Sequence, residues 1–343
     1  MSGTRPIVKR ALVAMGIAAC AATLVAGQGR GREGGAEPPA ARPFAESTEA
    51  QQHVAAAMAL AKSDLVAEAK AFCTPTGPQR EALARQAAGL APIPDRVLEP
   101  IRIFENLYYI GFNDVGAWAI PTSAGIILFD ALNNGDEARD ILVPGLKKVG
   151  LDPAQIKYVI MAHGHADHYG GGLYLQNTYH PRILMGAPDW ETVVASERPG
   201  RPQMKRDMDV TDGQMITLGD TTVTLALTPG HTPGTITMLF PVKHQGRMHP
   251  AMLFGGTPAP TRQSLATSEH VFNDFARKQN AESALGSHPG ILMNTLPLME
   301  QLHKEYPSGS HPLLMGPERF GRYLSIMLEC GKARLAASDA GGR

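Results

Sequence analysis

The stretch that decides the fold is "MAHGHADHYGG", residues 161–171, in which three histidines and an aspartate fall within six positions. These side chains are His163, His165, Asp167 and His168. Neutral imidazole and carboxylate groups are the ligands that zinc and related metals prefer. Neither a strand nor a helix would place all four around a compact site, because each would spread them over different faces. The run is therefore predicted to be a turn, with Gly164 supplying the backbone freedom.

The sequence on either side supports a metal site rather than a surface cluster of solvated histidines. Residues 156–162, "IKYVIMA", form a short apolar, β-branched run typical of a buried strand. Residues 169–179, "YGGGLYLQNTY", contain the glycines of a turn and then a stretch compatible with a helix. The cluster is thus expected at the carboxyl end of a core strand, where α/β proteins tend to bind ligands.

The composition is that of a globular protein without a nucleic-acid partner. The chain has 343 residues, of which 43% are hydrophobic and 19% charged, as expected for one large domain or two small ones. Lys+Arg and Asp+Glu both number 32, so no basic surplus points to nucleic acid or an anionic membrane. A small-molecule substrate is the expected partner.

The first 45 residues are predicted to lie outside the folded domain. Residues 1–27 read as a signal peptide, because three basic side chains precede a run of small apolar residues. That run is too weakly apolar for a transmembrane anchor, so export to the periplasm or secretion is expected. The segment "IAAC" also resembles a lipoprotein box, which would place a lipid anchor on Cys20. Residues 28–45, rich in Gly, Pro and Arg, read as a disordered tether.

A cleaved chain would keep two cysteines, Cys73 and Cys330, near the two ends of the fold. In an oxidising compartment they could form a disulfide. Two buried free thiols are an equal alternative, since the sequence does not give their distance.

The remaining pattern predicts helices, then two groups of strands, then helices again. Residues 46–94 read as a helical extension with helices at 46–72, started at Ser47, and at 79–89. Strands are expected at 101–104, 107–111, 116–122, 125–130, 157–162, 182–186, 214–228 as a hairpin turning on Gly219-Asp220, 235–242 and 251–256. Helices are expected at 135–150 with a kink at Pro144, and at 170–178, 188–196, 268–280, 290–304 and 316–337. This order predicts an α/β fold with two sheets covered by helices on both outer sides.

Two further histidines occur after strand-like runs. His231 lies in "TPGHTPGT", where prolines and glycines should form a tight turn that points the imidazole inward. His288 lies in "LGSHPG", directly after the short run "ESALG". Both are predicted to be metal ligands. The other histidines are predicted to be solvated or capping residues, namely His53, His180, His244, His249, His270, His303 and His311.

Together, "HGHADH", His231 in "PGHTPG" and His288 resemble the metallo-β-lactamase-fold hydrolases over about residues 100–305. The resemblance implies an αββα sandwich over residues 95–310, with 311–343 as a C-terminal helix packed on it and the zinc site at the open edge between the sheets. It implies that His163, His165 and His231 bind one zinc ion and that Asp167, His168 and His288 bind a second. It also implies a supporting role for Asp130, at the end of "GIILFD".

One position narrows the resemblance within the family. Many members, including the glyoxalase II and ribonuclease Z types, have a metal-bridging aspartate after a strand resembling "MLFGG", and another β-lactamase subclass has a cysteine ligand there. This chain has Thr257 at that position. Ligation by histidine and aspartate alone is similar to the third subclass of metallo-β-lactamases. Two features depart from that subclass: "TPAPTR" (257–262) lacks its substrate-binding serines, and the N-terminal extension is longer.

The resemblance implies a dizinc hydrolase that opens a cyclic amide or ester by attack of a zinc-bound hydroxide, with β-lactams as the first candidate substrates. Asp167 is expected to orient that hydroxide. A lactonase or another ester hydrolase on the same site is the alternative within the enzymes. A zinc-binding protein without turnover is the alternative outside them. The sequence contains no GxSxG motif that would indicate a serine nucleophile.

Overall fold

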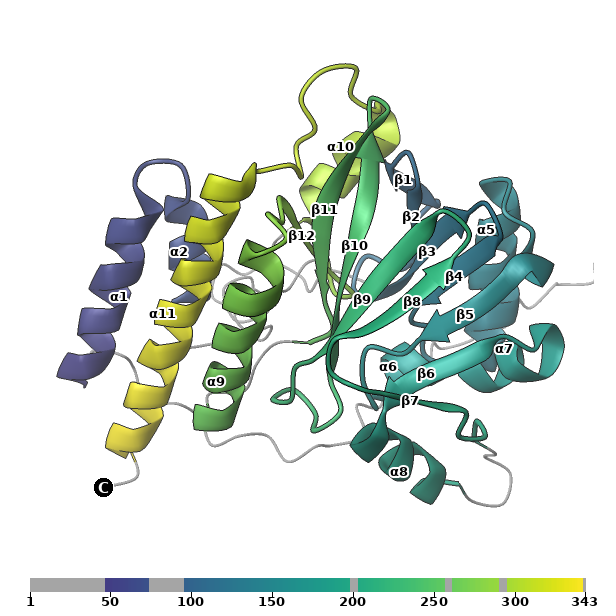
Figure 1. Ribbon diagram of the computed structural model, residues 1–343, viewed down its shortest axis with the longest axis horizontal. Helices are drawn as coiled ribbons and strands as arrows, with labels where there is room; N and C mark the ends of the chain where they lie inside the picture. The colour runs from purple at the N-terminus through teal and green to yellow at the C-terminus, as the bar shows by residue number, and fades with distance from the viewer. Residues whose placement is uncertain (1–46, 74–95, 198–202, 257–260, 290–294, 342–343) are drawn as a thin grey trace, which may run out of the picture. The chain divides into compact units, whose positions relative to one another are not determined.

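Two β-sheets lie face to face at the centre of the fold, with helices on both outer sides (Figure 1). The computed structural model describes residues 47–73, 96–197, 203–256, 261–289 and 295–341. The first sheet has seven strands in the order of the sequence, which are β1 Ile101–Phe104, β2 Leu107–Gly111, β3 Gly116–Thr122, β4 Gly125–Phe129, β5 Ile156–Ile160, β6 Arg182–Gly186 and β7 Met208–Val210. Strands β1 to β4 are antiparallel, and β4 to β7 are parallel.

The second sheet has five strands in the order β12-β11-β10-β9-β8. They are β8 Gln214–Leu218, β9 Thr221–Leu227, β10 Ile236–His244, β11 Arg247–Phe254 and β12 Ser283–Gly286. Each strand from β8 through β10 pairs antiparallel with the next one along the chain, whereas β12 runs parallel to β11. The predicted hairpin turn is confirmed, because Gly219 between β8 and β9 has φ +58°, a conformation that glycine adopts without strain.

The period-2 alternation of the strands separates the core into an inner and an outer layer. In β3, Trp118 and Ile120 are buried between the two sheets, whereas Ala117 and Ala119 face the helices outside the first sheet. Those helices are α4 Gly135–Glu137, α5 Val143–Lys148, α7 Gly172–Tyr179 and α8 Ala187–Ala195. The predicted αββα sandwich is thus confirmed.

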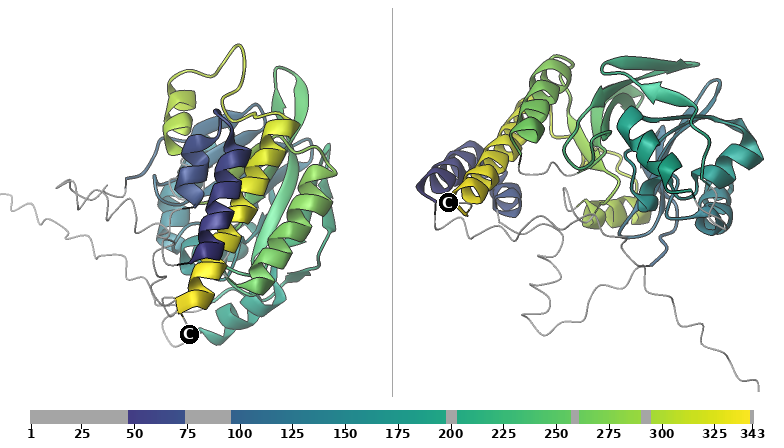
Figure 2. Two further views of the ribbon diagram at one scale, coloured as in Figure 1. Left: turned by 90° about the vertical axis from the view of Figure 1, so that its left-hand side faces the viewer. Right: turned by 90° about the horizontal axis from the view of Figure 1, so that it is seen from below.

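The outer face of the second sheet is covered by helices from both ends of the described chain. These are α1 Thr48–Ala61, α2 Val66–Phe72, α9 Arg262–His270 and α11 Pro317–Gly341. Helices α1, α2 and α11 share one apolar cluster with the second sheet, α9 contacts α11, and α1 lies beside α11 (Figure 2). Helix α10, Leu296–Lys304, instead packs its apolar side against β1.

A disulfide joins Cys73, at the end of α2, to Cys330 in α11, across a sequence separation of 257 residues. Of the two alternatives that the sequence left open, the structure therefore has the bonded one. The bridge ties the N-terminal helices to the C-terminal helix inside the apolar cluster that both share.

Several predicted helices are divided in the structure. The helix predicted over 46–72 begins as expected at Ser47, whose side chain accepts a hydrogen bond from the backbone N–H of Ala50, but it breaks at Lys62, which has φ +50°. The helix predicted over 135–150 changes to a π-helical turn at Ala138–Leu142, because Pro144 cannot donate to the carbonyl four residues earlier. Strand β7 was not predicted, since its three residues lie in a charged segment.

Other predictions fall on residues that the structure does not describe. They concern the signal peptide at 1–27, the tether at 28–45, the lipid anchor at Cys20, the helix at 79–89, and Thr257. Among the helices that are described, none has the length and apolar character needed to cross a membrane.

Candidate metal centre

Six predicted ligand side chains converge where the carboxyl ends of β5 and β12 meet the loop between β9 and β10. His163 and His165 lie in the turn after β5, and Asp167 and His168 lie in the one-turn helix α6, Ala166–Tyr169. His231 comes from the β9–β10 loop and His288 from the end of β12. The site therefore takes residues from both sheets, which is why ligands far apart in the sequence come together.

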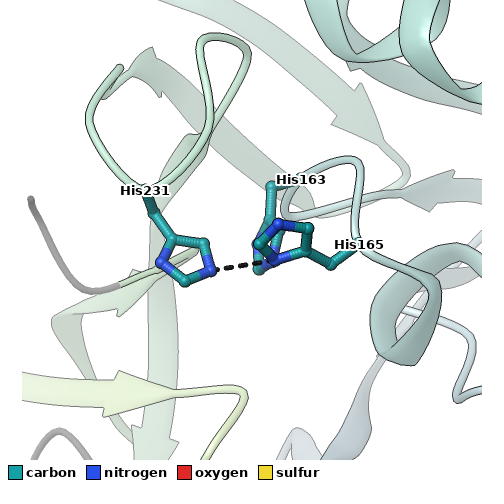
Figure 3. A group of neighbouring side chains, drawn as sticks. All are labelled: His163, His165 and His231. Atoms are coloured by element: carbon teal, nitrogen blue, oxygen red, sulfur yellow. Dashed lines mark hydrogen bonds between the residues drawn. The ribbon is translucent and has the colours of Figure 1, made fainter. Parts of the chain in front are cut away.

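The first group contains His163, His165 and His231, whose imidazole rings turn toward one another (Figure 3). The Nε2 atom of His163 lies 3.0 Å from Nδ1 of His165, and Nε2 of His231 lies 3.1 Å from the same Nδ1. Nitrogen ligands on a tetrahedral zinc ion are about 3.3 Å apart. Both separations from His165 are thus nearly what such an ion requires, and all three nitrogens lie within 4.8 Å of one another.

The second group contains Asp167, His168 and His288. The Nε2 atoms of the two histidines are 3.1 Å apart, and Oδ2 of Asp167 lies 3.3 Å from Nε2 of His288 and 3.5 Å from Nε2 of His168. The two groups are neighbours, because the ring centroids of His163 and His168 are 4.0 Å apart. Two metal ions held by these groups would lie side by side.

The ring nitrogens that point away from the centre are held by fixed acceptors. Nδ1–H of His163 donates to the carbonyl oxygen of Gly255 at 2.7 Å. The corresponding bond of His288 goes to the carbonyl oxygen of Asp114 at 3.0 Å. With a metal bound, such bonds would set the tautomer and leave Nε2 as the lone-pair donor facing inward, which is the usual arrangement behind metal-ligating histidines.

Asp130, for which the resemblance implied a supporting role, lies directly behind the second group and contacts His168. It is fully buried, and its Oδ2 accepts hydrogen bonds from Nδ1–H of His168 at 2.8 Å and from the hydroxyl of Ser287. Its Oδ1 accepts the backbone N–H of Ala162 at 2.7 Å. Asp130 has φ +69°, a strained conformation for a residue with a side chain, and these bonds are what hold it.

The pKa values of the ligands differ between the two groups. Burial lowers the pKa of His163 and of His165, and it lowers that of His231 to about 4, with the neighbouring imidazoles adding to the effect. Burial also lowers the pKa of His288, but the carboxylates of Asp114 and Asp167 outweigh it and raise the value to about 9. The first group is therefore neutral at pH 7, whereas His288 carries a proton that a metal must displace.

The donor set passes a simple test of fit for a transition metal. Five imidazoles and one carboxylate match zinc in softness, and their donor atoms converge. The outer nitrogens of His163, His168 and His288 each have a hydrogen-bond partner. Burial raises the pKa of Asp167, but hydrogen bonding to His288 and the neighbouring imidazoles outweigh burial and lower the pKa, so Asp167 stays ionised. Each group leaves open coordination positions, as catalytic metal sites do.

All six predicted ligands are thus brought together, whereas several predictions about other residues are wrong. His244 and His311 were predicted to be solvated or capping, but both are buried. Their rings pack against each other and against Tyr306, and they bond to the carbonyl oxygens of Gly309 and Ile103. Gly164 was predicted to supply backbone freedom, yet its φ is not positive. Its small size matters instead, since a Cβ there would lie 3.1 Å from the Cβ of Asp189.

Asp189 and Ser287 contact the centre but were not predicted. Asp189 occupies the third position of α8 and is 2% exposed. Its carboxylate accepts hydrogen bonds from the loops that carry the first group. An aspartate in the first turn of a helix normally reads as a capping or dipole-stabilising residue. The signal available in the sequence was its place directly after β6, at the same sheet edge as the ligands.

Comparison with known proteins agrees with this geometry. The family model of the metallo-beta-lactamase superfamily matches residues 111–243. The N-acyl homoserine lactonase AttM of Azorhizobium caulinodans is 34% identical over 102 residues, covering 27% of this chain and 38% of that protein. A hydroxyacylglutathione hydrolase of Acidiphilium cryptum is 34% identical over 86 residues, covering 25% of this chain and 31% of that protein. The chain thus spans less than half the length of these curated relatives.

Solved structures match over most of the fold. The subclass B3 metallo-beta-lactamase BJP-1 of Bradyrhizobium japonicum has a TM-score of 0.58 at 24% identity, covering 72% of this chain and 97% of that one. The metallo-beta-lactamase FEZ-1 of Legionella gormanii has a TM-score of 0.56 at 23% identity, covering 69% and 94%. At these identities the likeness establishes the fold that the chain shares with them.

Proposed function

The chain belongs to the metallo-β-lactamase superfamily through residues 111–243, and we propose that it is a hydrolase that uses two zinc ions to open a cyclic amide or ester. The observation that carries the proposal is the pair of three-donor groups that converge side by side at one sheet edge. A structural zinc site would instead be closed by four protein ligands. Three donors in each group leave room for water and substrate.

When bound, the zinc ions would polarise a carbonyl group and lower the pKa of a water molecule. The residues of the chain supply the positioning. The first group is open to solvent along His165, which is exposed, so a small molecule can reach it from that side. Asp167, with its lowered pKa, keeps an ionised carboxylate that is 36% exposed, so its oxygens can accept a hydrogen bond from the attacking water and orient it.

β-Lactams are the first candidate substrates. The chain resembles the third subclass of metallo-β-lactamases in its ligand set, and it shares the fold of subclass B3 enzymes. Lactones are the second candidate, because curated relatives with 30–34% identity are N-acyl homoserine lactonases. Both substrates present a strained or activated cyclic carbonyl to the same site.

A direct comparison of the two substrates tests the proposal. We expect the zinc-loaded protein to hydrolyse a chromogenic β-lactam such as nitrocefin and to lose this activity when a chelator removes zinc. The rate should be lower than that of a dedicated β-lactamase, because "TPAPTR" lacks the substrate-binding serines. Rapid opening of N-acyl homoserine lactones with no action on β-lactams would make the chain a lactonase. No chelator-sensitive hydrolysis of either substrate would contradict the proposed function.

The second metal group should be the more sensitive to acid. His288, with a pKa of about 9 in the metal-free protein, must lose a proton before it binds zinc, so the apparent affinity of the second group should fall about tenfold for each pH unit below 9. The zinc affinity of the first group should stay constant until the pH approaches the pKa of His231, which is about 4. Zinc titrations at pH 8.5 and pH 6 check this expectation. A parallel loss of both affinities would contradict it.

We also propose that the chain is exported. The support is the charged and apolar pattern of residues 1–27 together with the disulfide between Cys73 and Cys330, a bond that persists in oxidising compartments. N-terminal sequencing of the mature protein should give a start near Gln28, or show lipid on Cys20. A mature chain that keeps Met1 would contradict export.

A further inference from the structure

The buried carboxylate of Asp189 lies between the two loops that carry the first metal group and forms hydrogen bonds with both. Its Oδ2 accepts the backbone N–H of Gly164 at 2.8 Å and the hydroxyl of Thr232 at 2.5 Å. Its Oδ1 accepts the backbone N–H of Gly234 at 3.0 Å. Gly164 separates His163 from His165, and Thr232 follows His231 directly. The side chain of Asp189 therefore accepts hydrogen bonds from residues that adjoin all three ligands of the first group in the sequence.

Packing brings the same two loops against Asp189 as closely as backbone can approach. A Cβ on Gly164 would lie 3.1 Å from Cβ of Asp189, and a Cβ on Gly234 would lie 2.7 Å from Cγ of Asp189. Neither glycine has a positive φ. These glycines are thus required by the close approach of the aspartate and not by backbone conformation.

The bonds formed by Asp189 are those of a rigid connection. At 2% exposure the carboxylate has left bulk water, and the three N–H and O–H donors replace that hydration. Its partners come from different sheets, because the turn with Gly164 follows β5 of the first sheet and the loop with Thr232 joins β9 to β10 of the second. The position of His231 relative to His163 and His165 thus depends on this residue.

We propose that Asp189 is a positioning residue that sets the spacing of the first metal group by tying the β5 turn to the β9–β10 loop. The inference rests on the proposed metal centre but not on hydrolysis. Asp189 acts through the backbone on either side of the ligands and does not touch the metal. Its effect should therefore be confined to the first group, and the second group should keep its affinity.

The test is the zinc affinity of Asp189→Asn. In that variant an NH2 group replaces one oxygen and faces a backbone N–H or a hydroxyl, so at least one of the bonds is lost. Residues behind metal ligands are typically worth about 10–100-fold in metal affinity. Measured by chelator competition in a His288→Ala background, where only the first group binds, Kd should rise by about that factor. The visible spectrum of the Co²⁺-substituted protein should change with it.

Asp207→Asn is the matched control. Asp207 also accepts a backbone N–H, that of Ile183 at 2.9 Å, but it lies at the start of β7, at the opposite edge of the sheet. The Asp207→Asn variant should have lower thermal stability, but the Kd for zinc in the first group and the Co²⁺ spectrum should not change. Equal zinc affinities for Asp189→Asn and its parent, or an equal loss in Asp207→Asn, would overturn the inference. If the parent itself binds no zinc, the proposed function fails instead.

A milder pair of variants decides the case if Asp189→Asn does not fold. Thr232→Val removes only the hydroxyl bond to Asp189 and the local bond to Thr235, while Thr232→Ser keeps the hydroxyl. Kd of the first group should rise in Thr232→Val and return toward the parent value in Thr232→Ser. Equal zinc affinities in both variants and the parent would overturn the inference.

Discussion

Replacement of His288 by alanine is expected to leave the chain with one bound zinc ion instead of two. The second group would keep only Asp167 and His168, which is too few protein ligands for tight zinc binding. The first group would remain complete, because its three nitrogens come from other loops. Activity should fall by on the order of 10²-fold or more, since a positive charge near the reacting carbonyl is lost.

Elemental analysis of dialysed protein gives the metal counts. His270→Ala is the control, because His270 lies on α9, is exposed, and pairs with Asp274 and Asp212, so its loss should leave two zinc ions bound. Thr257→Ala should also bind two. Two retained zinc ions in His288→Ala would show that another residue completes the second group.

Removal of the disulfide is expected to lower the free energy of unfolding by about 3–5 kcal/mol, because the bridge closes a very long loop in the unfolded chain. The sequence separation of its cysteines is 257 residues. Alanine is the suitable replacement at both positions, since Cys73 is 6% exposed and Cys330 is fully buried. Urea unfolding of the Cys73→Ala/Cys330→Ala variant checks the value.

The metal centre provides the internal control for this variant. The bridge joins α2 to α11 on the outer face of the second sheet, so the variant should still bind two zinc ions. A reducing agent should lower the unfolding midpoint of the parent chain to that of the variant and leave the variant unchanged. Equal midpoints for the parent and the variant in the absence of reductant would contradict the expectation.

The ligands were predictable from the sequence because each follows an apolar strand and lies among glycines or prolines. That local pattern requires a strand end and a tight turn, and the fold of both sheets then brings the strand ends together. His231 and His288 were identified in this way although they lie 66 and 120 residues from partners in the centre. The strands were predictable for the same reason, since alternation and turn residues are local signals.

What could not be predicted depends on contacts between segments distant in the sequence. Asp189 reads locally as an ordinary first-turn acid, and only the approach of two loops gives its carboxylate three donors. His311 reads as a solvated or capping histidine, but its ring packs on Phe104 of β1 with the ring centroids 4.1 Å apart. The break in the N-terminal helix at Lys62 has no proline or glycine to announce it, and there Arg322 of α11 donates to the carbonyl of Leu60 and the carboxylate of Asp64.

The most direct test of the account is the zinc content of the purified chain, measured together with hydrolysis before and after chelation. We expect two zinc ions per chain after dialysis, one in each three-donor group. We also expect the chain to open a β-lactam or a lactone, to lose this activity when a chelator removes zinc, and to regain it when zinc is restored. Protein that retains no zinc, or hydrolysis that persists after complete metal removal, would contradict these expectations.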